Sequence, residues 1–273
     1  MRKRYMLIFG TAGVPISAED EFKGVDVLRK LNLGAMELEF VRGVYMKEDY
    51  AKKLKEYGKD IIFSAHASHY INLNANEEEK IENSIRRIIK TAKVLNNCGK
   101  NLVFHPGYYL KRSKEVTYNR IKSNIQRILD KLESLNLNVM LRPETTGKPS
   151  QFGDIDETLK LCFELDILPC IDFSHIYARS RGVINDYNSF YKILEKVEDV
   201  LGKNGIKDMH IHLSGIEYGK GGERRHLPLK ESKFNYKDVL KALKDFNASG
   251  TVICESPLLE EDAVLLMRCY NEL

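Results

Sequence analysis

The sequence lacks any stretch close to the roughly 20 consecutive apolar residues that a membrane-spanning helix requires. It also lacks CxxC or otherwise paired cysteine spacing. Its five cysteines are dispersed: Cys98, Cys162, Cys170, Cys254 and Cys269. An odd, dispersed set in a chain of 273 residues is typical of reduced cytoplasmic thiols. We therefore expect a soluble, cytoplasmic protein with no membrane partner, in which Cys170 and Cys254 are small core residues.

Three further absences narrow the class. The turn Gly10-Thr11-Ala12-Gly13 lacks the spacing of a phosphate-binding glycine-rich loop. No Ser/His/Asp or Cys/His arrangement calls for a covalent intermediate. No linker or low-complexity segment interrupts the chain, so we expect one domain over residues 1–273. With 43 basic and 39 acidic residues, the net charge of +4 permits a polyanionic substrate without requiring one.

What is present is an eightfold alternation of short apolar runs and amphipathic stretches. The predicted strands are Tyr5–Phe9, Ala35–Phe40, Ile61–Ala65, Leu102–Phe104, Val139–Arg142, Pro169–Asp172, Met209–Leu213 and Thr251–Glu255. The predicted helices lie near residues 18–31, 46–57, 76–97, 114–135, 154–166, 186–202, 235–246 and 259–271. Eight such units predict an α/β fold, a single (β/α)8 TIM barrel, with an open doubly wound sheet as the alternative. The basic, then briefly apolar N-terminus has no clear cleavage site, which favours a first barrel strand over a signal peptide.

All seven histidines fall at the downstream ends of predicted strands or just after them, and none falls in a predicted helix. They are His66, His69, His105, His175, His210, His212 and His226. Glu144, Asp172 and Glu255 stand at equivalent strand ends. Barrel enzymes carry their chemistry at the C-terminal ends of the strands. The pattern therefore predicts one metal site at that mouth.

The residue types indicate which chemistry such a site supports. A single strand-end histidine is more often structural, and a strand-end glutamate could pair with Arg142 inside the barrel. Burying several ionisable groups at one mouth without a cation would be costly, however. Imidazole and carboxylate ligands suit Zn²⁺, Mn²⁺ or Fe²⁺. There are too many candidates for one tetrahedral ion, and sites with several ions are typical of phosphoester hydrolysis.

An ordered set of short motifs extends from His66 to Glu255. The motifs are HxSxxINL, FHPG, PET, IDxxH, HL and ES. In this order and spacing they resemble the endonuclease IV family of apurinic/apyrimidinic endonucleases, in the xylose isomerase-like TIM barrel superfamily. The first two predicted strands match less clearly. The resemblance implies a barrel with two or three Zn²⁺ ions, Mn²⁺ being an alternative, and Glu144 as the catalytic residue.

Carried over residue by residue, the resemblance implies three groups of ligands. The first is His66, His105 and a bridging Glu144; the second is Glu144, Asp172, His212 and Glu255; the third is His175 and His226. His210, two residues before His212 on the same strand face, is expected one layer deeper. The third group departs from the family pattern Asp-Arg-His, because this chain reads Glu223-Arg224-Arg225-His226. Glu223 could replace the aspartate if the chain bulges by one residue; otherwise that metal is weak or absent.

The resemblance also implies contacts with double-stranded DNA that contains abasic sites. Arg42, His69 and Tyr70 are the candidate DNA-binding residues, with Tyr70 alternatively packing against the barrel rim. The basic segment from Tyr218 to Arg225 is expected to be a flexible loop that contacts phosphates or is simply solvated. A monomer is expected.

Three functions remain open at this point. The first is a metal-dependent endonuclease that hydrolyses the phosphodiester 5′ to abasic sites in DNA base-excision repair. The second is a single-metal sugar isomerase or epimerase, for which Glu144, Asp172, His212 and Glu255 would suffice and in which Glu39 could contact the sugar. The third is a barrel that binds nucleic acid or metal without catalysis. The extra histidines His66, His105 and His175 favour the first.

Overall fold

A computed structural model describes residues 6–273. Its eight parallel barrel strands are β1 (Leu7–Ala12), β2 (Ala35–Glu39), β3 (Ile62–His66), β4 (Gly99–Phe104), β5 (Met140–Pro143), β6 (Cys170–Asp172), β7 (Met209–Leu213) and β10 (Gly250–Cys254). Every predicted strand is present. The predicted first strand began at Tyr5, which lies outside the described residues, and its end is Ala12 rather than Phe9.

The strands form one parallel sheet in the order β5-β4-β3-β2-β1-β10-β7-β6. The sheet curls until its two edges meet, where an isolated parallel bridge joins Glu144, just after β5, to Cys170 at the start of β6. The amide of Thr145 donates to the carbonyl of Cys170 at 3.1 Å in the same place. The expected (β/α)8 barrel is confirmed, and it is closed at the residue that the sequence singled out as a bridging ligand.

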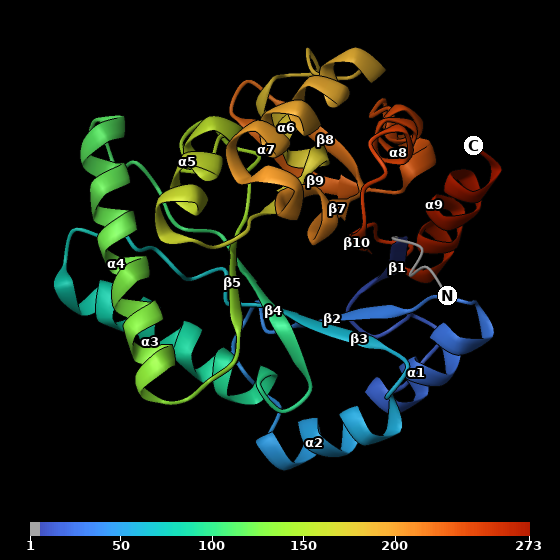
Figure 1. Cartoon of the computed structure of the whole chain (residues 1–273), viewed down its shortest axis with the longest axis horizontal. Helices are drawn as coiled ribbons and strands as arrows, with labels where there is room; N and C mark the ends of the chain where they lie inside the picture. Colours follow the sequence, from blue (N-terminus) through green and yellow to red (C-terminus); the bar gives the residue numbers. More distant parts are fainter. Residues whose placement is uncertain (1–5) are drawn as a thin grey trace.

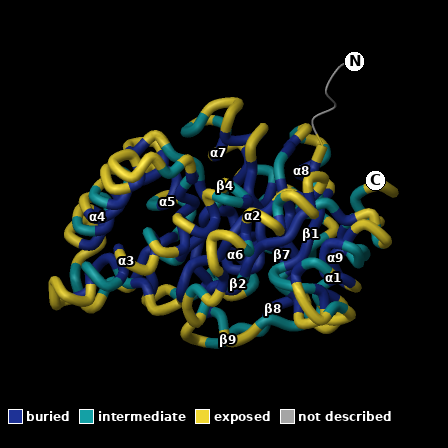
Figure 2. The backbone as a smooth tube through the Cα atoms, turned by 90° about the horizontal axis from the view of Figure 1, so that it is seen from below, coloured by how far each residue is buried: buried dark blue, intermediate teal, exposed yellow. Residues whose placement is uncertain are grey.

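Helices surround the strands (Figure 1). They are α1 (Glu21–Lys30), α2 (Glu48–Tyr57), α3 (Glu78–Leu95), α4 (Lys114–Ser134), α5 (Ile155–Leu165), α6 (Phe173–Arg179), α7 (Tyr187–Lys207), α8 (Tyr236–Asp245) and α9 (Glu260–Glu272), with a 3₁₀ turn at Leu229–Glu231. The amphipathic helices bury one apolar face, as α3 does with Ile81, Ile85 and Ile88, whereas the short α6 is buried along most of its length. Figure 2 shows the resulting division, with buried strands inside and exposed outer faces on the helices.

Helix α6, the strands β8 and β9 and the 3₁₀ turn were not predicted. Helix α6 follows β6 without an intervening loop, so that His175 lies in a helix and the expectation of helix-free histidines is wrong. The segment expected to be a flexible basic loop forms an antiparallel hairpin of β8 (Gly215–Gly219) and β9 (Gly222–Leu227). In that hairpin Arg224 and Arg225 pair with Glu217 at 3.3 and 2.7 Å.

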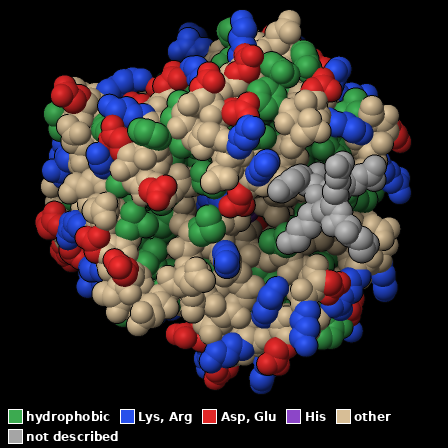
Figure 3. All heavy atoms as spheres, in the orientation of Figure 1, with side chains coloured by type: hydrophobic (Ala, Val, Ile, Leu, Met, Phe, Trp, Pro, Cys, Tyr) green, Lys and Arg blue, Asp and Glu red, His purple; other side chains and the backbone are tan. Residues whose placement is uncertain are grey.

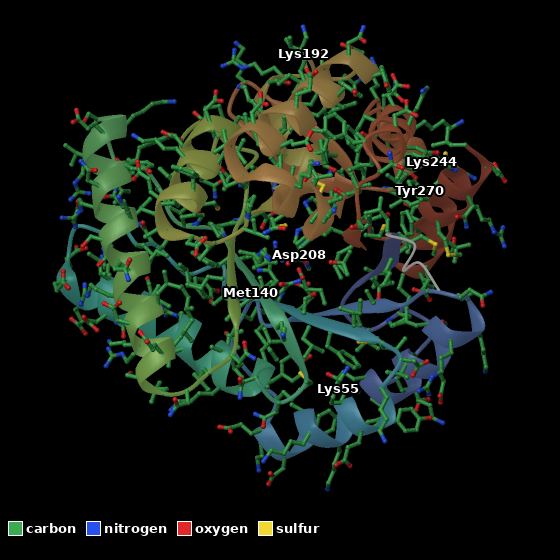
Figure 4. All side chains as sticks on the ribbon, viewed as in Figure 1. Lys55, Met140, Lys192, Asp208, Lys244 and Tyr270 are labelled. Atoms are coloured by element: carbon green, nitrogen blue, oxygen red, sulfur yellow. The ribbon has the colours of Figure 1, made fainter. Side chains whose placement is uncertain are left out.

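The N-terminal mouth of the barrel holds a cavity of about 790 Å³, whose lining includes Lys55, Met140 and Asp208 (Figure 4). Asp208 is its one carboxylate among the described residues, and no histidine lines it. On the surface shown in Figure 3, lysine and arginine side chains are interspersed with aspartate and glutamate. None of the helices within residues 6–273 combines the length and apolar character needed to cross a membrane.

Buried Arg142 lies on the interior side of β5 and points toward this N-terminal mouth. It donates to Asn101 Oδ1 at 3.0 Å and to a carboxylate oxygen of Asp208 at 2.9 Å. Arg142 therefore does not pair with a strand-end glutamate, which removes the structural alternative for Glu144. Arg142 also does not offset the negative charge of the carboxylates at the C-terminal mouth.

Candidate metal centre

The imidazoles and carboxylates predicted from the strand ends converge at the C-terminal mouth. Within residues 6–273, three groups there have ligand atoms that all lie within 4.8 Å of one another. The groups are His66, His105 and Glu144; Glu144, Asp172, His212 and Glu255; and His175, Glu223 and His226. We call them the first, second and third ligand groups. The parallel barrel strands bring the first two groups together, because their C-terminal ends reach the same mouth. Helix α6 and the β8–β9 hairpin contribute the third group.

The first and second groups share Glu144, which is fully buried. Its Oε2 lies 3.1 Å from Nε2 of His66 and 2.9 Å from Nε2 of His105. Its Oε1 lies 3.4 Å from Nδ1 of His212. The two oxygens thus face different imidazoles, which is the arrangement that a carboxylate bridging two cations requires.

Every member of the second group presents a buried atom without a hydrogen-bond partner among the described residues. These atoms are Oε1 of Glu144, Oδ2 of Asp172, Nδ1 of His212 and Oε2 of Glu255. Buried polar atoms in folded proteins are nearly always paired. A cation coordinated by all four residues would account for these four atoms without hydrogen bonds. The residues therefore fit a transition-metal ion of the kind expected from the sequence.

Asp172 has two roles that follow from its place at the junction of β6 and α6. Its Oδ1 accepts a hydrogen bond from the amide of His175 at 2.7 Å and so caps helix α6. Its Oδ2 lies 3.1 Å from Nδ1 of His175 but accepts no hydrogen bond from residues 6–273, and it belongs to the second group. The cap also fixes His175 one turn away, where Nδ1 lies 3.0 Å from the Thr145 carbonyl and Nε2 lies 3.4 Å from Glu223. That backbone contact orients the ring so that Nε2 faces the third group.

A β-bulge in the hairpin brings Glu223 into the third group. Glu217 pairs with Arg225 and Tyr218 pairs with Glu223, so that Arg224 has no partner in the register. Side chains alternate along a regular strand, and residues three apart would face opposite ways. The extra residue restores Glu223 to the face of His226. The structure thus contains the one-residue bulge on which the substitution of glutamate for the family's aspartate depended.

Burial and crowding perturb the protonation of this cluster. Burial lowers the pKa of His66, but contact with Glu144 and the charges of Glu39 and Glu37 together raise it to about 9. Burial raises the pKa of Asp172 to about 7 and that of Glu39 to about 8, where the nearby carboxylates add to the effect. Burial raises the pKa of Glu144 as well, but the neighbouring His105 and His212 lower it more, so that its pKa lies well below the usual range. Clusters of ionisable residues that shift one another's pKa values are typical of functional sites.

A second layer of polar residues lies directly beneath the ligands. Glu37 accepts hydrogen bonds from Ser64 Oγ at 2.6 Å and from His210 Nε2 at 2.7 Å, and all three residues are buried. His210 thus lies one layer deeper than His212, as expected. Its Nδ1 lies 2.9 Å from Thr251 Oγ1, so both ring nitrogens already have partners and the nearby trio Cys170, His210 and His212 is explained without an ion.

The predicted DNA-contacting residues surround the mouth. Arg42 is exposed in the loop after β2. His69 is also exposed, and its ring stacks on His105 at 5.6 Å between centroids. Tyr70 is 66% exposed, with the guanidinium of Arg87 5.9 Å from its ring. Tyr70 is therefore free to contact a partner and is not packed against the rim.

A cavity of about 270 Å³ opens above the ligand groups. Its wall combines residues of all three groups with Glu39 and the end of β1. The full lining is Ala12, Glu39, Val41, His66, His69, His105, His175, Glu223, His226, Glu255 and Leu259. It is smaller than the cavity at the N-terminal mouth. Its chemistry, and not its size, marks it as the candidate site.

The chain is similar to proteins of known family. A family model described as xylose isomerase-like TIM barrel matches residues 25–273. The uncharacterized protein MJ0133 of Methanocaldococcus jannaschii is 92% identical over 273 residues, which are 100% of both chains. A "Probable endonuclease 4" of Acholeplasma laidlawii is 27% identical over 256 residues, 87% of this chain and 85% of that protein.

Two solved structures share the fold. A D-tagatose 3-epimerase-like protein superposes with a TM-score of 0.76 at 18% identity, covering 97% of both chains. Endonuclease IV from Thermus thermophilus superposes with a TM-score of 0.70 at 20% identity, covering 98% of this chain and 99% of that one. The resemblance expected from the motifs is confirmed at the level of the family: this chain belongs to the xylose isomerase-like TIM barrels.

Proposed function

We propose that the protein is a metal-dependent endonuclease that hydrolyses the phosphodiester bond 5′ to abasic sites in double-stranded DNA. The observation that carries the proposal is the third ligand group. A sugar epimerase that uses one ion needs only the second group, whereas His66, His105, His175, Glu223 and His226 extend the site to three adjoining groups. The bulge at Arg224, which completes the third group, supports the same reading.

In this proposal the ligands hold two or three Zn²⁺ ions, with Mn²⁺ as the alternative. Bound ions would supply a nucleophile from water at neutral pH and neutralise charge on the phosphodiester. The protein's own contribution is geometric. Glu144 is the catalytic residue because it joins the first two groups, one of its oxygens facing His105 and the other His212.

Substrate selection would come from the mouth. The cavity of about 270 Å³ lies just below the size range of roughly 300–1,000 Å³ typical of pockets for drug-sized ligands, which suits a single sugar unit. Tyr70, His69 and Arg42 would contact the flanking DNA, since exposed aromatic and basic side chains stack on bases and bind phosphates. A nucleotide without a base is the least costly to turn out of the duplex. We propose a cytoplasmic monomer acting in DNA repair.

A nicking assay on a duplex with one abasic site tests the proposal when metals are quantified in the same preparation. We expect cleavage 5′ to the abasic site, with two or three zinc ions per chain. Glu144→Gln is expected to lose both cleavage and bound metal. Glu133→Gln, an exposed change on the outer helix α4, is the matched control and should keep both. A fully loaded protein that leaves the duplex intact would exclude the proposal.

The second candidate function is a sugar isomerase or epimerase. The observation that favours it is the completeness of the second group, since Glu144, Asp172, His212 and Glu255 alone could hold one ion beside a carbonyl substrate. A protein that binds a single ion per chain and interconverts ketoses without cutting DNA would establish this function. A metal-loaded protein inert toward both substrates would point to binding without catalysis.

A further inference from the structure

One carboxylate at the mouth belongs to none of the three ligand groups. Glu39 is the last residue of β2, and its Cα pairs in register with that of His66 on β3. It lines the cavity above the ligands together with His66 and Glu255. On its other side, β1 ends in small residues, and Gly13 approaches the Glu39 side chain without a side chain of its own.

Glu39 has no protein partner that would explain its burial. Its Oε1 is buried, and no residue within 6–273 donates a hydrogen bond to it. Glu37, two residues earlier on the same face, differs because Ser64 and His210 both donate to it. A buried acceptor without a donor is costly, so the partner of Glu39 is expected in the cavity that it lines.

The chemistry of that partner follows from the acceptor. A carboxyl group accepts a hydrogen bond from a hydroxyl whether it is ionised or protonated. Within a DNA strand the deoxyribose units carry no free hydroxyl, because the 3′ and 5′ oxygens are esterified to phosphate and C1′ holds a base. An abasic deoxyribose in its ring form is the exception, since C1′ holds a hydroxyl group in place of the base.

We propose that Glu39 accepts a hydrogen bond from the C1′ hydroxyl of the abasic deoxyribose and thereby helps to distinguish it from an intact nucleotide. This inference rests on the proposed function, and it assigns to Glu39 a role in substrate recognition that the metal ligands do not have. In an intact nucleotide the C1′ hydroxyl is replaced by a ring nitrogen of the base that carries no hydrogen, so the carboxyl group would have no donor at that position. Sites built to bind a hydroxyl discriminate strongly against ligands that lack it.

Two abasic substrates test the proposal directly. One is a duplex with a natural abasic site, made by removing uracil from a deoxyuridine; the other has a tetrahydrofuran residue, which is the same ring without the C1′ hydroxyl. The measured quantity is the ratio of kcat/KM on the natural site to that on the tetrahydrofuran site. We expect a ratio of about ten for the unchanged protein, the size of one hydrogen bond to a carboxyl group.

Two variants connect that ratio to Glu39. Glu39→Ala removes the acceptor, and the ratio should fall to about one. Glu39→Gln keeps an acceptor oxygen at the same place, and most of the preference should return. A ratio near one in the unchanged protein, or a ratio that survives Glu39→Ala, would overturn the proposal.

Metal content and thermal unfolding are measured on each variant, and both should match the unchanged protein. A metal ion lost from Glu39→Ala would make Glu39 a ligand and not a recognition residue, which also overturns the proposal. Failure of the proposed function gives a different result: the metal-loaded, unchanged protein would cut neither duplex, and this inference would fall with that function.

Discussion

Oε1 of Glu37 lies 2.9 Å from Nε2 of His212, while Nδ1 of the same ring faces Glu144 and Glu255 at 3.4 and 3.3 Å. A carboxylate beside one ring nitrogen favours the proton on that nitrogen. The lone pair of Nδ1 is then directed toward the second ligand group. This is the relationship by which buried carboxylates orient histidine ligands of metals.

Glu37→Gln is therefore expected to weaken metal binding at the second group by about 10- to 100-fold, because the neutral amide no longer holds the proton on Nε2. Competition with a chromophoric chelator measures the affinity. Glu21→Gln is the matched control, since Glu21 is also buried but bonds to Tyr45 and Tyr50 on the outer side of the barrel. Equal affinities of Glu37→Gln and the unchanged protein would show that the contact is merely structural.

The third ligand group predicts a specific response to changes in the hairpin. Glu223→Ala should reduce the bound metal by one ion per chain, whereas Glu217→Ala on the facing strand should not. Deletion of Arg224 removes the bulge residue and leaves Glu223 two positions before His226, on the same strand face. The deletion should thus keep the ion. Loss of the ion on deletion would mean that the bulge itself shapes the site. Metal analysis after gel filtration gives the count.

Metal uptake is expected to depend on pH through His66. Its pKa is raised from 6.5 to about 9, so the ring is protonated at pH 7 and must release its proton to bind a cation. Apparent affinity should rise with pH, by about tenfold per pH unit for one proton, and level off above pH 9. Calorimetry in two buffers of different ionisation enthalpy counts the protons released. Zero protons released at pH 7 would contradict the prediction.

Without bound cations, the stability of the protein should change with pH in the opposite direction to its metal affinity. A folded-state pKa above the unfolded value stabilises the protein most below pH 6.5, and that contribution is lost as pH rises through about 9. In the presence of chelator, the free energy of unfolding should therefore decrease as the pH rises from 6.5 to about 9. With metal bound the trend should reverse, because the cation replaces the proton. Urea unfolding at pH 6, 7.5 and 9 with and without chelator distinguishes the two cases.

The sequence predicted the barrel and the convergence of most candidate ligands for one physical reason. Strand ends of a parallel barrel meet at one mouth whatever the loops do, so His66, Glu144 and Glu255 could be placed without coordinates. Features that depend on local geometry were not predictable. Helix α6 starts directly at its cap, Asp172, without the loop that usually marks a helix start.

The pairing partners of residues inside the barrel could not be predicted from the sequence either. Arg142 could have pointed toward either mouth, and only the structure shows its pairing with Asp208 and Asn101. The bulge at Arg224 was recognised as a condition for Glu223 to face His226, but strand pairing decides whether it forms. Glu37 and Glu39 are both glutamates on one strand face. Depth in the barrel separates them, because Glu37 has donors beneath the mouth and Glu39 has none among residues 6–273.

The buried guanidinium of Arg142 makes a prediction for stability. Arg142→Ala leaves Asn101 Oδ1 without its donor and opens a cavity, which should cost about 3 kcal/mol of unfolding free energy. Arg127→Ala is the matched control, as Arg127 is partly exposed and pairs with Glu78 and Glu82 on the outer helices; it should cost under about 1 kcal/mol. Equilibrium unfolding in urea measures both. Equal costs would mean that the interior network contributes no more than a surface pair.

Tyr70 separates recognition of DNA from metal binding. Its ring is exposed beside the mouth and belongs to no ligand group, so Tyr70→Ala should keep every metal ion. If the ring stacks on a base next to the abasic site, its loss should weaken duplex binding by about tenfold, within the range of roughly 1–3 kcal/mol for one base-stacking contact. Tyr57→Ala, a partly exposed tyrosine at the end of α2, serves as the control. Fluorescence anisotropy with a labelled abasic duplex measures the affinity. Unchanged binding by Tyr70→Ala would move the DNA contact to other loops of the mouth, with Arg42 the next residue to replace.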